Sequence, residues 1–366
     1  MARANPGATI VVTGCYATRQ PDDVGGLPNV VRVVHNDDKP RFLDIVRDLT
    51  TAGRFGDGDG SCGAAIEPGV AGRTAFTLRV QTGCAEPCSY CIIPATRGAP
   101  RSVAVGDVLR DVERVAAAGF KEIALTGVHL GSYGRDLEPR ASLVDLLRAL
   151  DHHIASRATR SASPPGVLFR ISSLEPMDCA RAIDDLVERS ARFAPHFHLP
   201  LQHASDRVLA AMRRPYTIGH YASLVNGIRA TIPHASIGTD IIAGFPGETD
   251  DDFEQLVRYL DDAPLTHVHV FPYSDRPGTV ASSMSGKVPG AVVRERARRV
   301  RESGQRLTER FRAAQVGTTH QALTLEDGTL AVTGNYLKVR IPAGQPRNTW
   351  VRIRLLSHQD GELLAG

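Results

Sequence analysis

The sequence lacks any segment that would place the protein in or across a membrane. None of its apolar runs approaches the roughly 18–20 residues of a membrane span, and residues 1–7 lack the apolar core of a secretory signal peptide. These absences predict a cytoplasmic protein with no membrane partner. Because cytosolic thiols stay reduced, we expect clustered cysteines to serve metal binding or catalysis rather than disulfides.

Lysine is scarce: only four of the 43 lysine and arginine residues are lysines. A GC-rich genome is the simplest explanation of this bias. A net charge of +3 excludes a polycation, but eight arginines fall between residues 294 and 312. Such a run is typical of a solvated helix face or of a nucleic-acid contact, since planar guanidinium groups suit phosphates and bases.

Three of the six cysteines, Cys84, Cys88 and Cys91, form a C-x3-C-x2-C array after an apolar run that predicts a strand. Three thiolates do not complete a structural zinc site, which requires four ligands. Their close spacing is typical of an iron–sulfur cluster, and a four-iron cluster with three protein ligands keeps one iron open for a substrate. A zinc site with a distant fourth ligand, or a redox thiol pair, is the alternative.

The array and its surroundings resemble the radical S-adenosylmethionine (SAM) methylthiotransferase family, and the resemblance covers nearly the whole chain. Within that family the chain is most similar to the subgroup that methylthiolates threonylcarbamoyl-adenosine next to the tRNA anticodon. Sister groups act on isopentenyl-adenosine or on an aspartate of a ribosomal protein. The strings that carry the resemblance lie at residues 83–102, 125–134, 172–177, 198–202, 212–216 and 269–279.

The resemblance implies a [4Fe-4S] cluster on Cys84, Cys88 and Cys91, with SAM bound to its open iron. It further implies that SAM cleavage yields a 5′-deoxyadenosyl radical, which removes hydrogen from C2 of the adenine. Sulfur then enters at or near a second cluster, and a second SAM supplies the methyl group. The implied partners are the tRNA anticodon loop, whose target base must leave its stack, a reductant protein and a sulfur donor. We expect a monomer.

Residues 70–300 are predicted to form a partial (β/α)6 barrel, the fold of the radical SAM core. Hydrophobic periodicity alternates strands with helices, and in such folds the loops after the strands carry the chemistry. The strands are predicted near residues 75–81, 120–126, 167–172, 195–199, 235–242 and 265–271. The helices are predicted near residues 106–118, 141–155, 179–192, 205–213, 218–231 and 249–261.

Candidate cofactor-binding residues lie in the cysteine loop or just after these strands. By resemblance, the second strand end lies against the amino group of SAM, and the polar groups after the third strand can reach a ribose. Glycines after the fifth strand permit close approach of a flat adenine. The candidates are Tyr90, Thr126, Gly127, Ser172, Ser173, Glu175, Gln202, Asp240 and Gly244.

Four histidines alternate along two predicted strands, at His196, His198, His267 and His269. A metal pair is one interpretation, but barrel-interior histidines satisfied by their neighbours are commoner. Cys179 begins a predicted helix and is expected to be a small buried residue.

Residues 1–65 are predicted to be the remnant of an α/β N-terminal domain plus a linker, with strands at 8–13 and 27–34 and a helix at 40–49. In the family this domain holds the second cluster on three cysteines, and Cys15 matches the third of these ligands. The first two have no counterpart, and Cys62, in a Gly/Asp/Ser-rich linker, matches none. The second cluster is therefore in doubt, and we expect either a start codon assigned too late or a truncated form. Otherwise Cys15 is a buried, inert thiol.

Residues 316–366 are predicted to form a small β domain, with strands at 321–325, 336–341 and 350–356. By resemblance this is a TRAM-like RNA-binding barrel, in which aromatic stacking and guanidinium groups hold unstacked bases. A stabilising β appendage is the alternative. The residues of the predicted RNA-binding face are Tyr336, Arg340, Arg352 and Arg354.

Other functions remain open beside the preferred one. The alternatives are a methylthiotransferase for isopentenyl-adenosine in tRNA and a truncated chain that cleaves SAM without inserting sulfur. The alternative from a different class is an RNA-binding protein with a structural cluster.

Overall fold

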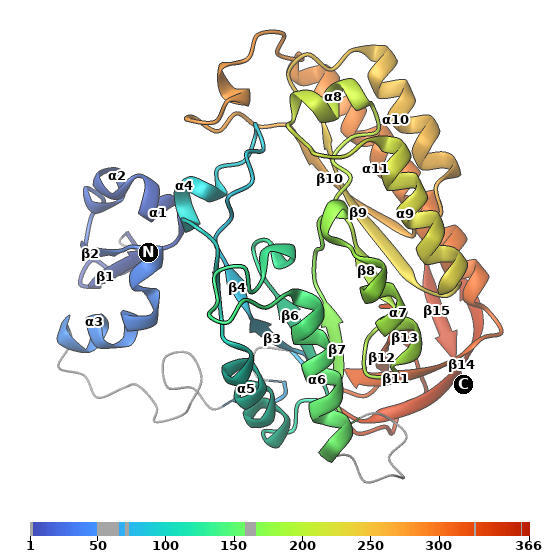
Figure 1. The fold of residues 1–366 in the computed structure, drawn as a ribbon. Coiled ribbons are helices and arrows are strands. Elements are labelled where there is room, and N and C mark those ends of the chain that lie inside the picture. The colour runs from blue at the N-terminus through green and yellow to red at the C-terminus, as the bar shows by residue number, and fades with distance from the viewer. Residues whose placement is uncertain (1–2, 50–65, 70–72, 158–165, 326, 360) are drawn as a thin grey trace.

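The computed structural model describes residues 3–49, 66–69, 73–157, 166–325, 327–359 and 361–366. Along the chain, a small α/β unit precedes a large central α/β body, which is followed by a β-barrel (Figure 1). No helix in these ranges is long and apolar enough to span a bilayer. Cys62 lies outside the described residues.

The N-terminal unit has the predicted strands and helix. Two parallel strands, β1 and β2, form its sheet, and short helices connect and flank them. The bounds are β1 (Ile10–Thr13), α1 (Cys15–Arg19), α2 (Pro21–Gly25), β2 (Val30–Val34), the 3-10 helix η1 (Asn36–Arg41) and α3 (Phe42–Leu49).

The central body confirms the predicted partial barrel of six parallel strands. The strands form two sheets of three, in the orders β3-β6-β7 and β10-β9-β8, and a bridge between Phe169 and Phe193 connects the sheets. The strands are β3 (Phe76–Arg79), β6 (Glu122–Thr126), β7 (Leu168–Ile171), β8 (His196–His198), β9 (Ser236–Ala243) and β10 (His267–Pro272). A short hairpin pair, β4 (Gln81–Thr82) and β5 (Arg101–Ser102), encloses the cysteine loop and α4 (Ile93–Arg97).

Helices cover the outer face of these strands (Figure 1). Helix α5 shows why: its valines at 108, 112 and 115 lie on one face, and all three are buried. Helix α10 begins at a capping box, in which Thr249 and Asp252 satisfy each other's backbone N–H groups. The helices are α5 (Val105–Ala117), α6 (Leu143–Arg157), α7 (Arg181–Arg189), α8 (Asp206–Ala211), α9 (Ile218–Thr231), α10 (Asp250–Asp262) and α11 (Gly290–Gln315).

The C-terminal part is a closed five-stranded barrel in the order β11-β12-β13-β15-β14. Its three predicted strands are confirmed, whereas β12 and β15, of four residues each, were not predicted. The strands are β11 (Thr319–Leu325), β12 (Leu330–Thr333), β13 (Lys338–Arg340), β14 (Trp350–Gln359) and β15 (Glu362–Ala365). The barrel has a hydrophobic core of its own. Because α11 runs continuously from the body to the barrel, the division at 70–300 and 316–366 stays a prediction.

The turn between β12 and β13 docks this barrel on the central body. Arg170 Nη1 donates to the Gly334 carbonyl over 3.0 Å. The side chain of Asn335, which is buried, donates to the His234 carbonyl over 2.9 Å and to Gln315 Oε1 over 3.0 Å. These contacts hold the C-terminal barrel against the central body.

Candidate active site

The cysteine loop follows β3 and β4 and is held in one conformation by its backbone. Gly83 has φ of 76°, and a Cβ there would lie 2.0 Å from the Ala99 carbonyl oxygen, so the position requires glycine. Ser89 fixes the middle of the loop, because its N–H donates to the Met212 carbonyl over 3.1 Å and its hydroxyl to the Ala211 carbonyl over 2.8 Å. Residues far apart in sequence thereby position the three thiols.

The three thiols of Cys84, Cys88 and Cys91 are free, half-buried and close enough to affect one another's ionisation. Burial raises the pKa of the Cys88 and Cys91 thiols, and the neighbouring cysteines raise it further. Three thiols on one loop fit an iron–sulfur cluster, whereas a structural zinc ion requires a fourth ligand.

Arg214 places a guanidinium group directly beside the loop, which the sequence analysis did not predict. Its Nη1 donates to Cys88 Sγ over 3.1 Å, its Nε donates to the Tyr216 hydroxyl over 3.0 Å, and its Nη2 pairs with Glu175. This cation lowers the pKa of the Cys88 thiol against the effect of burial. The available signal was the string at 212–216, which was used for the resemblance only.

A pocket of about 160 Å³ beside the cysteine loop brings together three of the predicted cofactor-binding residues, Tyr90, Gln202 and Asp240. Gln202 adopts φ of 70°, and its N–H donates to the Asp240 carbonyl over 2.8 Å. Arg276, which also lines the pocket, was not predicted. The pocket has charged and polar groups on its wall and adjoins the cysteine loop through Tyr90, so it is a suitable place for a charged, cluster-bound cofactor.

Two other candidates lie elsewhere: Ser172 and Ser173 line a second, larger cavity. Glu175 is engaged by Arg214, and the Thr126 hydroxyl donates to the Leu78 carbonyl over 3.3 Å. The roles predicted for these residues in SAM binding stay predictions.

The two glycine candidates have close neighbours within the protein. A Cβ on Gly127 would lie 2.7 Å from Leu130 Cδ2, and a Cβ on Gly244 would lie 2.4 Å from Val293 Cγ2. Packing against the chain itself therefore explains the absence of a side chain at both positions, and contact with adenine is not needed to account for it.

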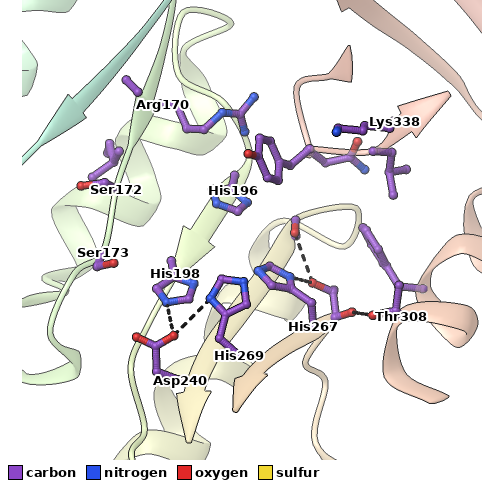
Figure 2. A pocket seen from close by; sticks show the side chains of 18 of the residues that line it. Arg170, Ser172, Ser173, His196, His198, Asp240, His267, His269, Thr308 and Lys338 are labelled. Atoms are coloured by element: carbon purple, nitrogen blue, oxygen red, sulfur yellow. Dashed lines mark hydrogen bonds and ion pairs between the residues drawn. The ribbon is translucent and has the colours of Figure 1, made fainter. Parts of the chain in front are cut away.

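The four predicted histidines line the larger cavity, of about 580 Å³, inside the partial barrel (Figure 2). They meet because β9, which lies between β8 and β10, contributes Gly238, where a Cβ would lie 2.0 Å from His267 Nε2. Burial lowers the pKa of His267 to about 4 and that of His196 well below its usual range, so both rings are neutral at pH 7.

Asp240 joins two of these histidines. Its Oδ1 lies 2.9 Å from His198 Nε2 and 3.3 Å from His269 Nδ1. The ligand atoms of this group are close enough to hold one metal ion. The contact between Asp240 and His198 is also a hydrogen bond, so a neighbour satisfies His198 without a metal ion.

Cys15 lies in the N-terminal unit, on the side that faces α4. Asn36 connects the two, because its Nδ2 lies 3.7 Å from Cys15 Sγ and 2.9 Å from the Thr96 carbonyl oxygen. Cys15 is the one cysteine among residues 3–49, so these residues supply a single thiolate and do not by themselves fit a second cluster. Cys179 is buried, as expected, and its thiol lies 3.7 Å from Asp184 Oδ1.

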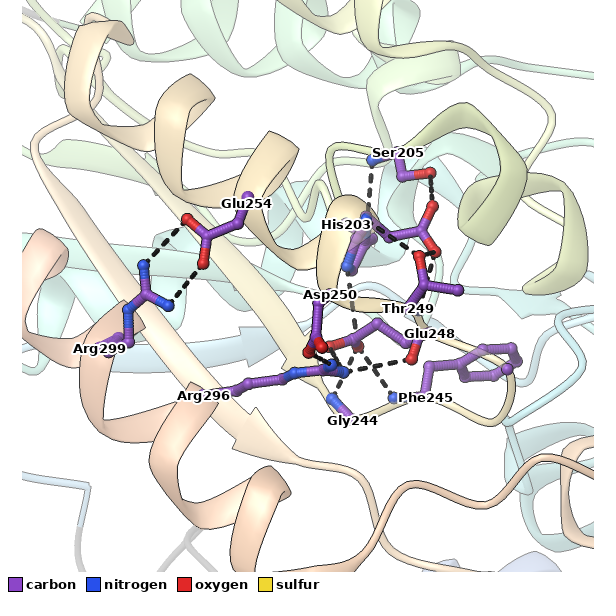
Figure 3. A network of polar contacts seen from close by, with 12 residues as sticks. His203, Ser205, Gly244, Phe245, Glu248, Thr249, Asp250, Glu254, Arg296 and Arg299 are labelled. Atoms are coloured by element: carbon purple, nitrogen blue, oxygen red, sulfur yellow. Dashed lines mark hydrogen bonds and ion pairs between the residues drawn. The ribbon is translucent and has the colours of Figure 1, made fainter.

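Most arginines of the basic run in α11 have partners within the protein. Arg296, which is buried, binds Glu248 and Asp250, and Arg299 binds Glu254 (Figure 3). Further side chains of the run that bind acidic residues or carbonyls are Arg298, Arg306, Arg310 and Arg312. This pairing gives the run a structural role, and nucleic-acid contact by α11 stays a prediction.

On the C-terminal barrel, one residue of the predicted RNA-binding face is bound within the protein and the others are exposed. Tyr336 is 55% exposed, whereas Arg340 forms an ion pair with Glu362. Arg352 and Arg354 lie on the exposed side of β14. The face stays a prediction.

Comparison with known proteins supports the interpretation of the cysteine loop. Residues 78–260 match the radical SAM superfamily. The threonylcarbamoyladenosine tRNA methylthiotransferase MtaB of Aquifex aeolicus is 34% identical over 92% of this chain and 81% of its own length. The tRNA-2-methylthio-N(6)-dimethylallyladenosine synthase of Streptomyces viridosporus is 33% identical over 92% of this chain and 66% of its own length.

A solved structure shows the same fold. The cobalamin-dependent SAM radical enzyme OxsB, with aqua-cobalamin and SAM bound, superposes with a TM-score of 0.51 at 12% sequence identity, over 82% of this chain and 43% of that chain. At this identity the likeness concerns the fold alone.

Proposed function

Because this chain belongs to the radical SAM tRNA methylthiotransferase family, we propose that it methylthiolates C2 of threonylcarbamoyl-adenosine next to the tRNA anticodon. The observation that carries the proposal is that Tyr90, in the loop of Cys84, Cys88 and Cys91, lines a pocket together with Gln202 and Asp240. The pocket and the thiols belong to one end of the partial barrel, where such folds place their chemistry.

The cysteine loop and the adjacent pocket would each hold one of the two cofactors. Cys84, Cys88 and Cys91 would hold a [4Fe-4S] cluster, and SAM would lie on the open side of the cluster in the adjacent pocket. When bound, these groups supply the one-electron chemistry that removal of a C2 hydrogen requires, which no side-chain base can supply. The further candidates for SAM contact are Thr126, Gly127, Ser172, Ser173, Glu175 and Gly244.

The chain's own residues prepare this site. Arg214 brings a positive charge to Cys88, which favours the thiolate that an iron ligand must be. The hydrogen bonds of Ser89 to the end of α8 hold the loop, so the three thiols keep their relative positions.

The tRNA is proposed to approach through the opening that the C-terminal barrel borders. Tyr336 and Lys338 of this barrel line the histidine cavity, which offers an aromatic face and a cation to an unstacked base. A reductant protein and a sulfur donor would complete the reaction. No step is assigned to a second cluster, because the described residues do not supply its ligands.

Isopentenyl-adenosine is the second candidate substrate. It is supported by the synthase of Streptomyces viridosporus, whose identity to this chain, 33%, nearly equals that of the MtaB enzyme of Aquifex aeolicus.

Nucleoside mass spectrometry tests the proposal. tRNA is taken from a strain that lacks the activity and is complemented with this chain or with its Cys88→Ala variant. We expect a methylthio group on threonylcarbamoyl-adenosine with the wild-type chain only. A methylthio group on isopentenyl-adenosine instead would select the second candidate, and product from the variant would refute the assignment of the cysteine loop.

A further inference from the structure

Phe271 is an aromatic residue at the junction of two cavities. It lines both the histidine cavity and the pocket beside the cysteine loop, and Asp240 is the other residue that lines both. Its side chain is half exposed, at 50%. The ring is therefore accessible to a ligand that reaches from one cavity into the other.

Strand β10 explains why the ring points into the partial barrel. His267, His269 and Phe271 alternate along this strand and all line the histidine cavity, because alternate residues of a strand face the same side. Phe271 stands next to the last residue of β10, at the carboxyl end of the strand, where folds of this kind place their chemistry.

The ring of Phe271 contributes little to the packing of the protein. The hydrophobic core clusters of the described residues do not include it. Two other phenyl or phenol rings line the histidine cavity, and both have partners: Phe311 packs against the core of the C-terminal barrel, and Tyr336 lies under the guanidinium of Arg170, 4.6 Å from its ring centroid. Phe271 is thus the accessible ring whose position the core does not explain.

The chemistry of the proposed reaction needs a flat surface at this junction. The adenine C2 has to contact a cofactor held beside the cysteine loop, whereas the rest of the nucleotide needs the larger cavity, of about 580 Å³. A base that has left its stack also loses the neighbouring bases. Proteins replace these neighbours with aromatic side chains, and stacking on such a ring tolerates different substituents at the edge of the base.

We propose that the ring of Phe271 stacks on the target adenine and holds its C2 toward the cysteine loop. The inference rests on the proposed function and names a residue that positions the substrate. Because the contact uses the face of the base, it serves threonylcarbamoyl-adenosine and isopentenyl-adenosine alike. Removal of the ring should therefore weaken RNA binding only when the base is present.

The test compares anticodon stem-loop RNAs that carry threonylcarbamoyl-adenosine, plain adenosine or an abasic site at the target position. Cluster-loaded protein with SAM and without reductant is titrated with each RNA, so that no turnover occurs. Unstacking the base costs free energy that the abasic RNA does not require. The measured quantity is therefore the effect of each substitution on the RNAs with the base relative to its effect on the abasic RNA.

Phe271→Leu keeps an apolar side chain but removes the ring. It should weaken the binding of both adenosine RNAs by about tenfold, a modest value for one base on one aromatic ring, and leave the abasic RNA unchanged. Phe271→Tyr keeps the ring and should retain the wild-type affinities. Tyr16→Leu removes an exposed ring that lines neither cavity and is the matched control.

Equal effects of Phe271→Leu on the adenosine RNAs and the abasic RNA would overturn the inference, as would no effect on any of them. Equilibrium dialysis of SAM with the variants, in the absence of RNA, provides a further check. Loss of SAM binding in Phe271→Leu would show that the ring holds the cofactor rather than the target base.

Turnover of the wild-type chain with a reductant tests the proposed function separately. Absence of methylthio product, together with a base-dependent effect of Phe271→Leu, would refute the transferase assignment and leave the stacking contact in place. Methylthio product without a base-dependent effect would support the transferase assignment and refute the role of Phe271.

Discussion

Among the three thiols of the loop, Cys88 has the surroundings that best fit a metal ligand. It contacts Arg214 and lies near both other cysteines. We predict that Cys88→Ala lowers the iron content by about one four-iron cluster per chain and abolishes formation of 5′-deoxyadenosine from SAM. Iron analysis and chromatography of the products of SAM with a reductant measure both effects.

Cys179 offers the matched control, because it is also buried but lies beside Asp184 rather than the loop. Cys179→Ala should keep both the iron and the cleavage activity. Iron retained by Cys88→Ala would contradict the assignment of this cysteine as a ligand. SAM cleavage lost equally in both variants would instead point to a folding defect.

His267 makes the free energy of unfolding of the protein depend on pH. Burial lowers the pKa of His267 to about 4, whereas an unfolded histidine has a pKa of about 6.5. Between these values the unfolded chain binds a proton that the native chain does not, so the free energy of unfolding falls as the pH drops from 6.5 to 4. The expected fall is roughly 3 kcal/mol.

Urea unfolding followed by circular dichroism at several pH values measures this effect. His267→Gln removes the titrating group, so the free energy of unfolding should fall less between pH 6.5 and 4 than in the wild-type chain. His220→Gln, at an exposed position in α9, should keep the wild-type dependence. An unchanged pH profile in His267→Gln would show that other groups cause it.

Helix α11 is held on the central body by a buried ion pair (Figure 3). Glu248 is fully buried, and its carboxylate accepts from the Gly244 N–H over 2.7 Å and from Arg296 Nη1 over 2.7 Å. Removing one partner of a buried pair leaves an uncompensated charge. We predict that Arg296→Met lowers the free energy of unfolding by about 3–5 kcal/mol, measured by chemical denaturation.

A second arginine of the same helix provides the comparison. Arg298 is exposed and pairs with Glu295 and Glu302 within α11. Because exposed pairs contribute little, Arg298→Met should change the free energy of unfolding by less than about 1 kcal/mol. Equal effects of the two substitutions would mean that the pair between Arg296 and Glu248 does not hold the helix.

The docking of the C-terminal barrel on the central body depends on Asn335. This side chain is 1% exposed, binds His234 and Gln315, and accepts from the Thr333 hydroxyl over 2.6 Å. We predict that Asn335→Ala leaves these partners without their hydrogen bonds and weakens the docking by about 1–3 kcal/mol. Faster hydrogen exchange in β12 and β13 is the expected measurement, compared with Thr329→Ala, which removes a hydrogen bond within the barrel's own turn.

Sequence periodicity was sufficient for the order and type of the six parallel strands of the central body and of helices α5 to α10. The strand from Ser236 to Ala243 and helices such as α5 carry strong local patterns, because strands and helices bury residues at different spacings. Four short strands, β4, β5, β12 and β15, were not predicted. The cysteine spacing likewise indicates a cluster by itself, since all three thiols belong to one loop.

The relations between distant residues could not be obtained from the sequence. Arg214 meets Cys88, and Arg170 meets Tyr336, only because packing brings separate strands, loops and the C-terminal barrel together. The arginines of α11 looked alike in sequence, and the fold gave most of them separate acidic or carbonyl partners.

The sequence by itself determined the element order, the partial barrel and the cysteine loop of this protein, because these depend on local spacing and burial. The tertiary structure decided which of the predicted side chains share a pocket. It alone showed that neighbouring side chains leave no room for a Cβ at Gly127 and Gly244, and that Arg170 and His196 line a common cavity. Such facts depend on contacts between segments that only the folded chain brings within a few ångströms.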